Sequence, residues 1–194
     1  MSAGRDAGLV LLLLGAVAAC GADAPRPSAN VHQATPERAL PRGHHAAADA
    51  PASDVDARLA EVARAHGGAG PWAVAGYRMG AHALTTLGLP RGSFDLEIVH
   101  YTPHEVQYAC IADGASAATG ATVGKLNLSL KDAPAPDTRT TYRNRKSGSA
   151  VTLRITHVFA KRFLEVPRER LGAAGREAME LPDRDVFEVM PEAN

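Results

Sequence analysis

The segment PWAVAGYRMGAHALTTL, residues 71–87, says most about the fold of this chain. Pro71 can open a helix because the first helical residue needs no N–H partner. Gly88 is a typical C-terminal stop, and Pro90 follows just beyond it. Alanine and glycine recur through residues 73–83, and such small residues let a helix lie close against another element. We therefore expect a helix at 71–87 that packs closely on a neighbour.

The residues before this helix predict a second helix, joined to the first by a glycine-rich loop. Apolar residues recur at helical spacing, at Val55, Leu59, Val62 and Ala63. Ser53 or Asp54 can cap the first turn. The pattern ends at HGGAG, residues 66–70, where a ligand could approach the backbone closely because glycine carries no side chain.

The residues after the central helix predict strands and further helices. Strand patterns occupy residues 94–101, 126–131, 138–143 and 151–158, with a hairpin turn at 144–149. Thr102 and Glu105 have the capping-box spacing that opens a helix. Another helix is expected at residues 169–181, and a short extended tail is expected at residues 186–189. This order predicts an α+β fold, with helices packed on a mixed, mainly antiparallel four-stranded sheet.

The N-terminal residues predict export. An apolar run at residues 8–19 follows Arg5 and ends in small residues before Cys20, which is the pattern of a secretory signal peptide over residues 1–20. The run is too short to span a bilayer. Residues 21–53 are rich in Ala, Pro, Asp, Arg and His and show no hydrophobic period. We therefore expect a disordered tether there, ahead of one folded domain at 54–194.

The sequence Val17-Ala18-Ala19-Cys20 resembles the lipobox of bacterial lipoproteins. This resemblance implies cleavage before Cys20, lipidation of its thiol, and attachment to a membrane through the acyl chains. Gly21 rather than Asp follows the cysteine. In Gram-negative lipoproteins this implies the outer membrane, and hence the periplasmic side of the cell envelope. The alternative is an ordinary signal peptide with a chance cysteine.

Charge and cysteine content narrow the classes of function. Lys plus Arg number 21 and Asp plus Glu number 21, so no basic excess points to nucleic acid. The chain has two cysteines. If Cys20 is lipidated, Cys110 has no disulfide partner within the chain. Its thiol is then buried and inert, reactive, or a metal ligand.

The residues around Cys110 allow a chemical role for its thiol. If Cys110 lies in a helix, Asp113 shares its face three residues later, and a helix N-terminus would lower the thiol pKa. The alternative is a buried cysteine that acts as a small hydrophobe. His100 and His157 stand near the ends of predicted strands, where we expect hydrogen-bonded core histidines.

Several spaced motifs resemble the FmdE family, which is named after formylmethanofuran dehydrogenase. Across most of residues 54–189 they are His66-Gly67, Gly70-Pro71, Gly76-Tyr77-Arg78-Met79-Gly80, Cys110-Ile111-Ala112-Asp113-Gly114, Thr119-Gly120, Gly124-Lys125, Asn127-Leu128, Asn144-Arg145-Lys146-Ser147-Gly148, Leu181-Pro182-Asp183 and Phe187-Glu188-Val189. The resemblance implies an α+β fold and a metal site, typically for zinc, near the family's His-Gly-His-x-Cys-Pro motif and its later cysteine. This chain departs from that pattern, since Gly68 replaces the second His, Gly70 the first Cys, and Ala121 a further Cys of many members.

The resemblance therefore leaves His66 and Cys110 as metal ligands. A thiolate and an imidazole suit a soft or borderline divalent ion such as Zn²⁺. The remaining positions would come from water, from Asp113, His100 or His104, or from a second copy of the chain in a homodimer. A small ligand would lie between the His66 loop and the Cys110 helix. Its binding residues are predicted to be Gly67, Tyr77, Asp113, Lys125 and Asn127.

The function predicted from these features is that of a lipid-anchored, exported FmdE-like binding protein for a metal ion or small ligand. One alternative is an enzyme that uses Cys110 as nucleophile and His66 as base. The sequence shows neither an oxyanion hole nor a third residue to orient His66, so the enzyme ranks below the binding module. The other alternative is a structural relic that kept the fold and lost the site. The chain lacks the cysteines of an iron–sulfur protein, so it is not the redox component of a dehydrogenase.

Overall fold

Residues 53–191 are described by a computed structural model. They belong to one compact unit, residues 46–194, which has a hydrophobic core of its own. The predicted signal peptide, Cys20 and the predicted tether up to residue 52 lie outside the described residues. Within residues 53–191, no helix is both long and apolar enough to cross a bilayer.

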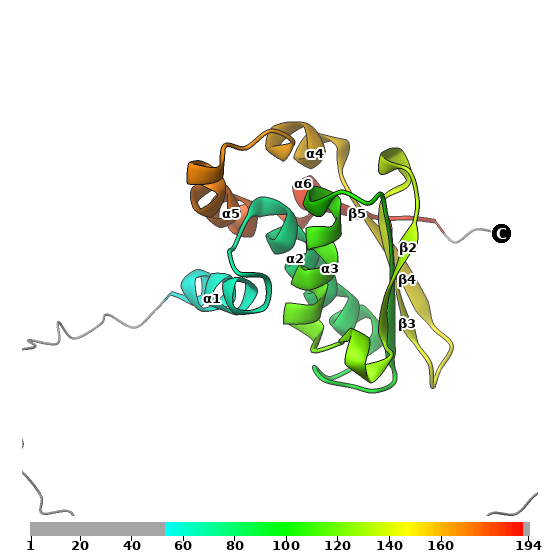
Figure 1. The fold of residues 1–194 in the computed structure, drawn as a ribbon. Helices are drawn as coiled ribbons and strands as arrows, with labels where there is room; N and C mark the ends of the chain where they lie inside the picture. Colours follow the sequence, from blue (N-terminus) through cyan, green and yellow to red (C-terminus); the bar gives the residue numbers. More distant parts are fainter. Residues whose placement is uncertain (1–52, 192–194) are drawn as a thin grey trace, which may run out of the picture. The chain divides into compact units, whose positions relative to one another are not determined.

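The described chain begins with two helices and then has a strand, a helix, three strands, three helices and a last short strand (Figure 1). The α-helices are α1 (Asp54–His66), α2 (Pro71–Leu87), α3 (Val106–Thr119), α4 (His157–Phe163), α5 (Leu171–Glu180) and α6 (Asp183–Val186). The strands are β1 (Leu96–Thr102), β2 (Leu128–Asp132), β3 (Arg139–Asn144), β4 (Ala150–Ile155) and β5 (Phe187–Val189). Short 3-10 turns are η1 (Val123–Lys125), η2 (Ala135–Asp137) and η3 (Arg168–Arg170).

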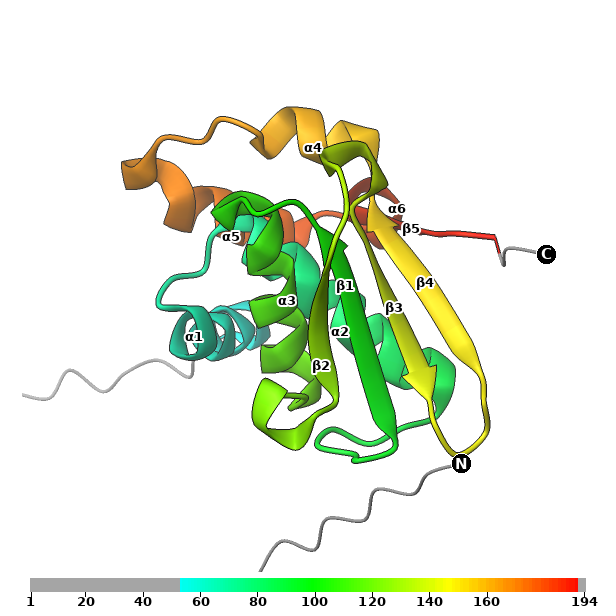
Figure 2. The same cartoon turned by 45° about the vertical axis from the view of Figure 1, so that its right-hand side comes forward.

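The sheet has the strand order β2-β1-β3-β4-β5, as Figure 2 shows. β1 and β2 are parallel, and the other neighbours are antiparallel. The α+β class and the mixed sheet are confirmed, but the predicted number of four strands is wrong. The tail predicted at 186–189 supplies the additional strand, in which Phe187 pairs with Ile155 of β4. Three residues are too few for an alternating pattern to mark a strand in the sequence.

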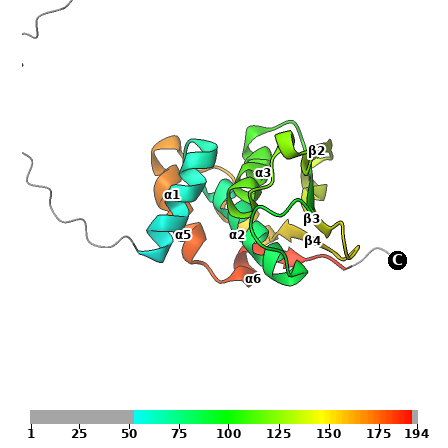
Figure 3. The ribbon, with the colours of Figure 1, turned by 90° about the horizontal axis from the view of Figure 1, so that it is seen from below.

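The helices form two layers on one face of the sheet. Figures 1 and 3 show α2 and α3 between the sheet and the outer pair α1 and α5. The inward side chains of β1, β3 and β4 are fully buried under α2 and α3, among them Ile98, Tyr142 and Leu153. Since α2 is covered by a sheet on one side and by helices on the other, most of its residues are apolar.

The central helix begins at Pro71 and ends at Leu87, as predicted, and its close packing is also confirmed. A Cβ atom on Gly76 would lie 2.0 Å from the carbonyl oxygen of Ile111 in α3. A Cβ atom on Gly114 would lie 1.8 Å from the carbonyl oxygen of Ala73 in α2. No side chain fits at either position, so these two glycines set the distance between α2 and α3.

Two predicted elements need correction after β4. The strand predicted at 151–158 ends at Ile155, because the Thr156 hydroxyl accepts the Phe159 N–H at 3.0 Å and caps α4. The helix predicted at 169–181 is divided into η3 and the shorter α5. A seven-residue helix is too short for its apolar period to be separated from that of a strand.

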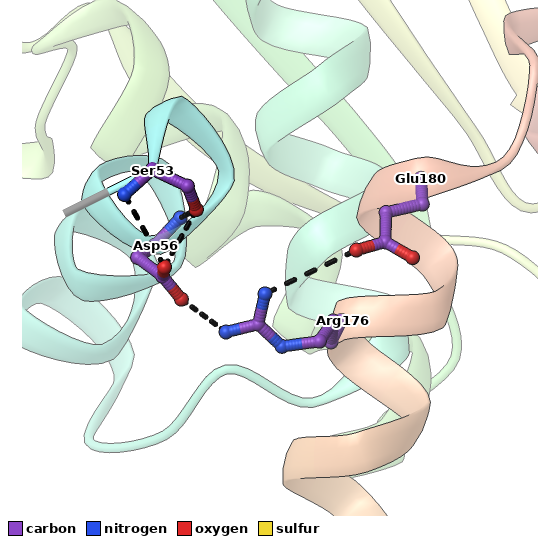
Figure 4. A network of polar contacts seen from close by, with 4 residues as sticks. All are labelled: Ser53, Asp56, Arg176 and Glu180. Carbon is purple, nitrogen blue, oxygen red and sulfur yellow. Dashed lines mark hydrogen bonds and ion pairs between the residues drawn. The ribbon is translucent and has the colours of Figure 1, made fainter.

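The outer helices α1 and α5 are joined by a polar network at the start of α1 (Figure 4). The Ser53 hydroxyl accepts the Asp56 N–H at 3.1 Å, and the Asp56 carboxylate pairs with the Arg176 guanidinium of α5. Arg176 also lies 3.9 Å from Glu180. The hydrogen bond from Ser53 and the pairing with Arg176 hold the pKa of the Asp56 carboxyl below its ordinary value.

Candidate functional site

His66 is the last residue of α1, and the loop after it is held in place by α5. Gly67 caps the helix at φ 87°, and its N–H donates to the Ala63 carbonyl at 2.8 Å. A Cβ atom on Gly175 of α5 would lie 1.7 Å from the Ala69 carbonyl oxygen, so α5 rests directly on loop 66–70. The position of the His66 ring therefore depends on both α1 and α5.

The structure brings His66, Cys110 and Asp113 together. The Cys110 Sγ lies 3.2 Å from His66 Nε2, and the Asp113 Oδ2 lies 2.8 Å from His66 Nδ1. Cys110 and Asp113 are three residues apart on α3, so both face α1, as the spacing predicts. Because the two contacts use opposite nitrogens of the ring, Asp113 orients His66 while Nε2 remains directed at the thiol.

The electrostatics favour a neutral thiol when nothing is bound to it. Burial, and then the nearby Asp113 charge, raise the pKa of the Cys110 thiol. The contact with Asp113 suits the tautomer in which Nδ1 carries the proton, so Nε2 is free to accept the S–H proton. Cys110 lies in the second turn of α3, beyond the free N–H groups of the first turn. The helix N-terminus therefore does not stabilise a thiolate at this position. Any ligand that needs the thiolate must therefore displace the thiol proton.

Cys110 and His66 stand at the wall of a cavity of about 610 Å³. Its walls come from loop 66–70, the first turns of α2 and α3, the end of α4, η3 and the start of α5. Trp72 is the largest wall residue, and its indole N–H donates to the Phe163 carbonyl at 2.8 Å. The Trp72 ring packs edge-on against Tyr108 and Phe159, with centroids 5.0 Å and 6.0 Å away. The indole is thus held rigidly beside the thiol–imidazole pair.

The donor set fits a metal ion only in part. Among the described residues, no group of three or more His, Cys, Asp or Glu side chains is placed to hold an ion. His66 Nε2 and Cys110 Sγ are nevertheless 3.2 Å apart, close to the spacing of about 3.5 Å that tetrahedral Zn–N and Zn–S bonds give. The pair therefore suits two positions of an open site and cannot form a closed structural site alone.

The two further histidines predicted as candidate ligands lie elsewhere. His100 is fully buried in the sheet, with Nδ1 2.9 Å from Thr140 Oγ1 and Nε2 3.1 Å from the Tyr108 carbonyl oxygen. Burial lowers the pKa of His100 to about 4, so this ring is neutral near pH 7. His104 is exposed and pairs with Asp132 at 2.9 Å. Neither histidine lines the cavity.

Of the predicted ligand-binding residues, only Gly67 lines the cavity. The Tyr77 hydroxyl donates to Glu61 at 2.8 Å, and burial raises the pKa of Tyr77 to about 12. Lys125 and Asn127 follow the C-terminal end of α3. The Lys125 ammonium donates to the Gly120 carbonyl at 2.8 Å, and the Asn127 side chain accepts the Thr122 N–H at 2.9 Å. The prediction that Lys125 and Asn127 lie near the pocket is therefore not supported, because both side chains form hydrogen bonds within the loop beyond α3.

Sequence reasoning missed the apolar wall and the role of Asp113 toward His66. Phe163 and Leu164 lie between the strand predicted at 151–158 and the helix predicted at 169–181, and Leu171 lies in that helix. Nothing in the sequence indicated that the three residues share a cavity. The Cys110–Asp113 spacing was visible, but the partner of Asp113 was not. His66 lies 47 residues away from Asp113 in sequence, and only the fold brings it there.

The comparison with known families covers the residues of this site. Residues 65–188 match the family described as FmdE, molybdenum formylmethanofuran dehydrogenase operon. The chain belongs to the FmdE family. The match includes all three residues of the contact between α1 and α3, so the FmdE domain carries the candidate site. A search of curated proteins found no match.

Proposed function

We propose that this FmdE domain is a binding module that holds a divalent ion between His66 and Cys110 and a small ligand in the cavity beside it. The observation that carries the proposal is the placement of Nε2 and Sγ 3.2 Å apart at the wall of a 610 Å³ cavity. FmdE membership supports a metal-related role. A bound ion would supply Lewis acidity and open coordination positions.

Each residue has a separate task in such a site. His66 presents a neutral nitrogen, because Asp113 holds the other nitrogen at 2.8 Å and fixes the tautomer. Cys110 gives up its proton when the ion binds, since a coordinating thiol is deprotonated. Because the Cys110 pKa is raised, metal affinity should increase with pH. The two-ligand set favours weak, exchangeable binding over a permanent structural ion.

The contact of Asp113 with His66 also favours a second candidate function, that of a cysteine-dependent enzyme. It supplies the orienting third residue that the sequence did not show, and Cys110, His66 and Asp113 then form a nucleophile, base and orienting acid. In this reaction Sγ attacks a carbonyl carbon, Nε2 takes the thiol proton, and the leaving group departs with that proton. A raised thiol pKa requires His66 to act as general base during the attack.

Zinc binding to purified residues 46–194 tests the first candidate. Equilibrium dialysis with Zn²⁺ should show stoichiometric binding that is lost in His66→Ala and in Cys110→Ser. Asp113→Asn should weaken it about tenfold, because it removes the partner that orients the ring. His104→Ala is the matched control, since His104 is an exposed histidine outside the cavity, and it should bind as the parent does. Equal zinc content in the parent, His66→Ala and Cys110→Ser would remove the metal function.

A reactive ester tests the second candidate on the same proteins. An activated p-nitrophenyl ester should acylate Cys110 and release p-nitrophenolate, and mass spectrometry should detect one added acyl group. His66→Ala should slow this step, and Cys110→Ser should abolish it. A parent that binds no zinc, and whose thiol reacts with neither the ester nor alkylating reagents until it is unfolded, would be a structural relic.

We further propose that the domain is exported and anchored to the periplasmic side of the outer membrane through lipidated Cys20. The support is the sequence Val17-Ala18-Ala19-Cys20 with Gly21 after it. Attachment at Cys20 would connect the domain to the membrane through a tether of about thirty residues. The distance between domain and membrane would depend on the composition of that tether. The site would then take its ligands from the periplasm.

A further inference from the structure

The cavity beside Cys110 is mainly apolar. Trp72 and Phe163 are buried in its wall, and three exposed aliphatic side chains stand at its edge. Val106 is 80% exposed, Leu164 44% and Leu171 37%. These three residues come from α3, the end of α4 and the start of α5, so they gather around one opening although they lie far apart in sequence. Exposed aliphatic residues around an apolar cavity are typical of a site for an apolar ligand.

The charge of the lining favours an anionic head on that ligand. Arg168 and His66 line the cavity, and no Asp or Glu among the described residues does. Asp113 contacts His66 from the other edge of its ring and is not part of the lining. The first turns of α2 and α3 also line the cavity, and neither helix has a side-chain cap on its N–H groups. Free N–H groups at helix N-termini add positive potential beside Arg168.

The size of the cavity limits the ligand. A volume of 610 Å³ equals that of about 20 water molecules, at roughly 30 Å³ each in the liquid. The cavity is open on one side, so a ligand of about ten non-hydrogen atoms fills its inner part. A saturated carboxylic acid of eight carbons has this size.

We propose that the cavity binds an apolar monocarboxylate, whose aliphatic chain lies against Trp72 and whose carboxylate completes the coordination of the ion on His66 and Cys110. This inference rests on the proposed metal-binding function. An oxygen ligand suits the open positions of a borderline ion such as Zn²⁺. Arg168 would then pair with the same carboxylate group.

The chain provides its own reporter, because Trp72 is its single tryptophan. Its indole N–H is already satisfied by Phe163, and its ring is fixed by Tyr108 and Phe159. An aliphatic chain that enters the cavity would change the surroundings of the indole at its wall and should therefore change the Trp72 emission. Emission therefore reports on the cavity and does not depend on any catalytic activity.

Titration of residues 46–194 with octanoate, in the presence of saturating Zn²⁺, tests the inference. Octanoate should shift the Trp72 emission saturably and bind at least tenfold tighter than 1-octanol, which has the same chain without the carboxylate. Removal of zinc should weaken octanoate at least tenfold and leave 1-octanol unchanged. Arg168→Gln should weaken octanoate severalfold, whereas Arg170→Gln is the matched control outside the lining and should not.

The outcomes separate this inference from the proposed function. If zinc binds in dialysis but octanoate binds no tighter than 1-octanol, or not saturably, the inference is overturned and the metal function stands. If zinc does not bind at all, the proposed metal function is overturned, and the inference that the carboxylate coordinates the ion is overturned as well. Octanoate binding that is equal with and without zinc also overturns the inference.

Discussion

The close approach of α2 and α3 makes Gly114→Ala the most informative single change in the domain. The new Cβ atom would lie 1.8 Å from the Ala73 carbonyl oxygen, whereas real Cβ contacts are essentially never under 3.0 Å. The helices must therefore separate by about 1.2 Å along this contact, because backbone and not a flexible side chain is in the way. Overpacking of this kind costs about 3 kcal/mol, and the helix propensity of alanine offsets about 1 kcal/mol. We expect a net loss of about 2 kcal/mol in the free energy of unfolding.

The same displacement should reach the site, because Cys110 is one turn before Gly114 on α3. A shift of α3 away from α2 changes the 3.2 Å contact between Cys110 and His66, which sits on another helix. Urea unfolding followed by circular dichroism gives the stability, and alkylation of Cys110 by iodoacetamide in the folded protein gives the accessibility of the thiol. We expect faster alkylation together with the lower stability.

Gly172→Ala is the matched control for this experiment. Gly172 lies at the start of α5, and a Cβ atom there has nothing within 4 Å. This variant should be unchanged or more stable by up to about 1 kcal/mol, because alanine restricts the unfolded chain. If Gly114→Ala unfolds at the same urea concentration as Gly172→Ala, the reasoning about the α2–α3 contact is refuted.

Three further predictions concern pH, the membrane and the tether. Burial lowers the pKa of His100 from 6.5 to about 4, so between these pH values the unfolded chain binds the proton more readily than the folded chain. The free energy of unfolding should therefore decrease as the pH drops through this window, by about 3 kcal/mol once the pH is below 4. Urea midpoints from pH 7 to 4 should fall more in the parent than in His100→Asn; equal slopes would contradict this assignment. Cys20→Ser should move the protein from the membrane to the soluble fraction, and detergent partitioning that still places the variant with the membrane would exclude the lipid anchor. Limited proteolysis should cut residues 21–51 well before the domain, because this segment has too little apolar surface to fold, and a stable fragment that begins before Leu40 would contradict it.

Elements with strong local patterns could be predicted from the sequence, and those that depend on distant partners could not. Pro71 and Gly88 mark the ends of α2, and the same local rules placed α1 and the strands β1 to β4. β5 was missed because three residues carry no period, and α4 was missed because Thr156 caps it at the end of a strand pattern. In each case a tertiary contact or a single cap decided the structure.

The candidate site shows the same division. His66 and Cys110 could be selected as candidates from the sequence, since glycines follow the histidine and the cysteine stands three residues before an acid. Their contact could not be derived from spacing, because it joins α1 to α3. His100 was expected to be a hydrogen-bonded core histidine and only a possible ligand, and it is buried in the sheet with a contact to the Tyr108 carbonyl. His104, the other possible ligand, pairs with Asp132. The ranking of the enzyme alternative also changed, since only the structure shows that Asp113 orients His66.

The contact between Gly175 and Ala69 has a consequence for the order in which the protein matures. Loop 66–70 is made early in synthesis, but the surface on which it rests is made about 100 residues later. Until α5 has emerged and folded back, loop 66–70 lacks this support, and His66 is held only by its own helix and by its contacts with α3. A growing or C-terminally truncated chain therefore has His66 and Cys110 but an incomplete cavity, because the start of α5 supplies part of the wall. A small ligand that fills this cavity would be bound only after the whole domain has been made.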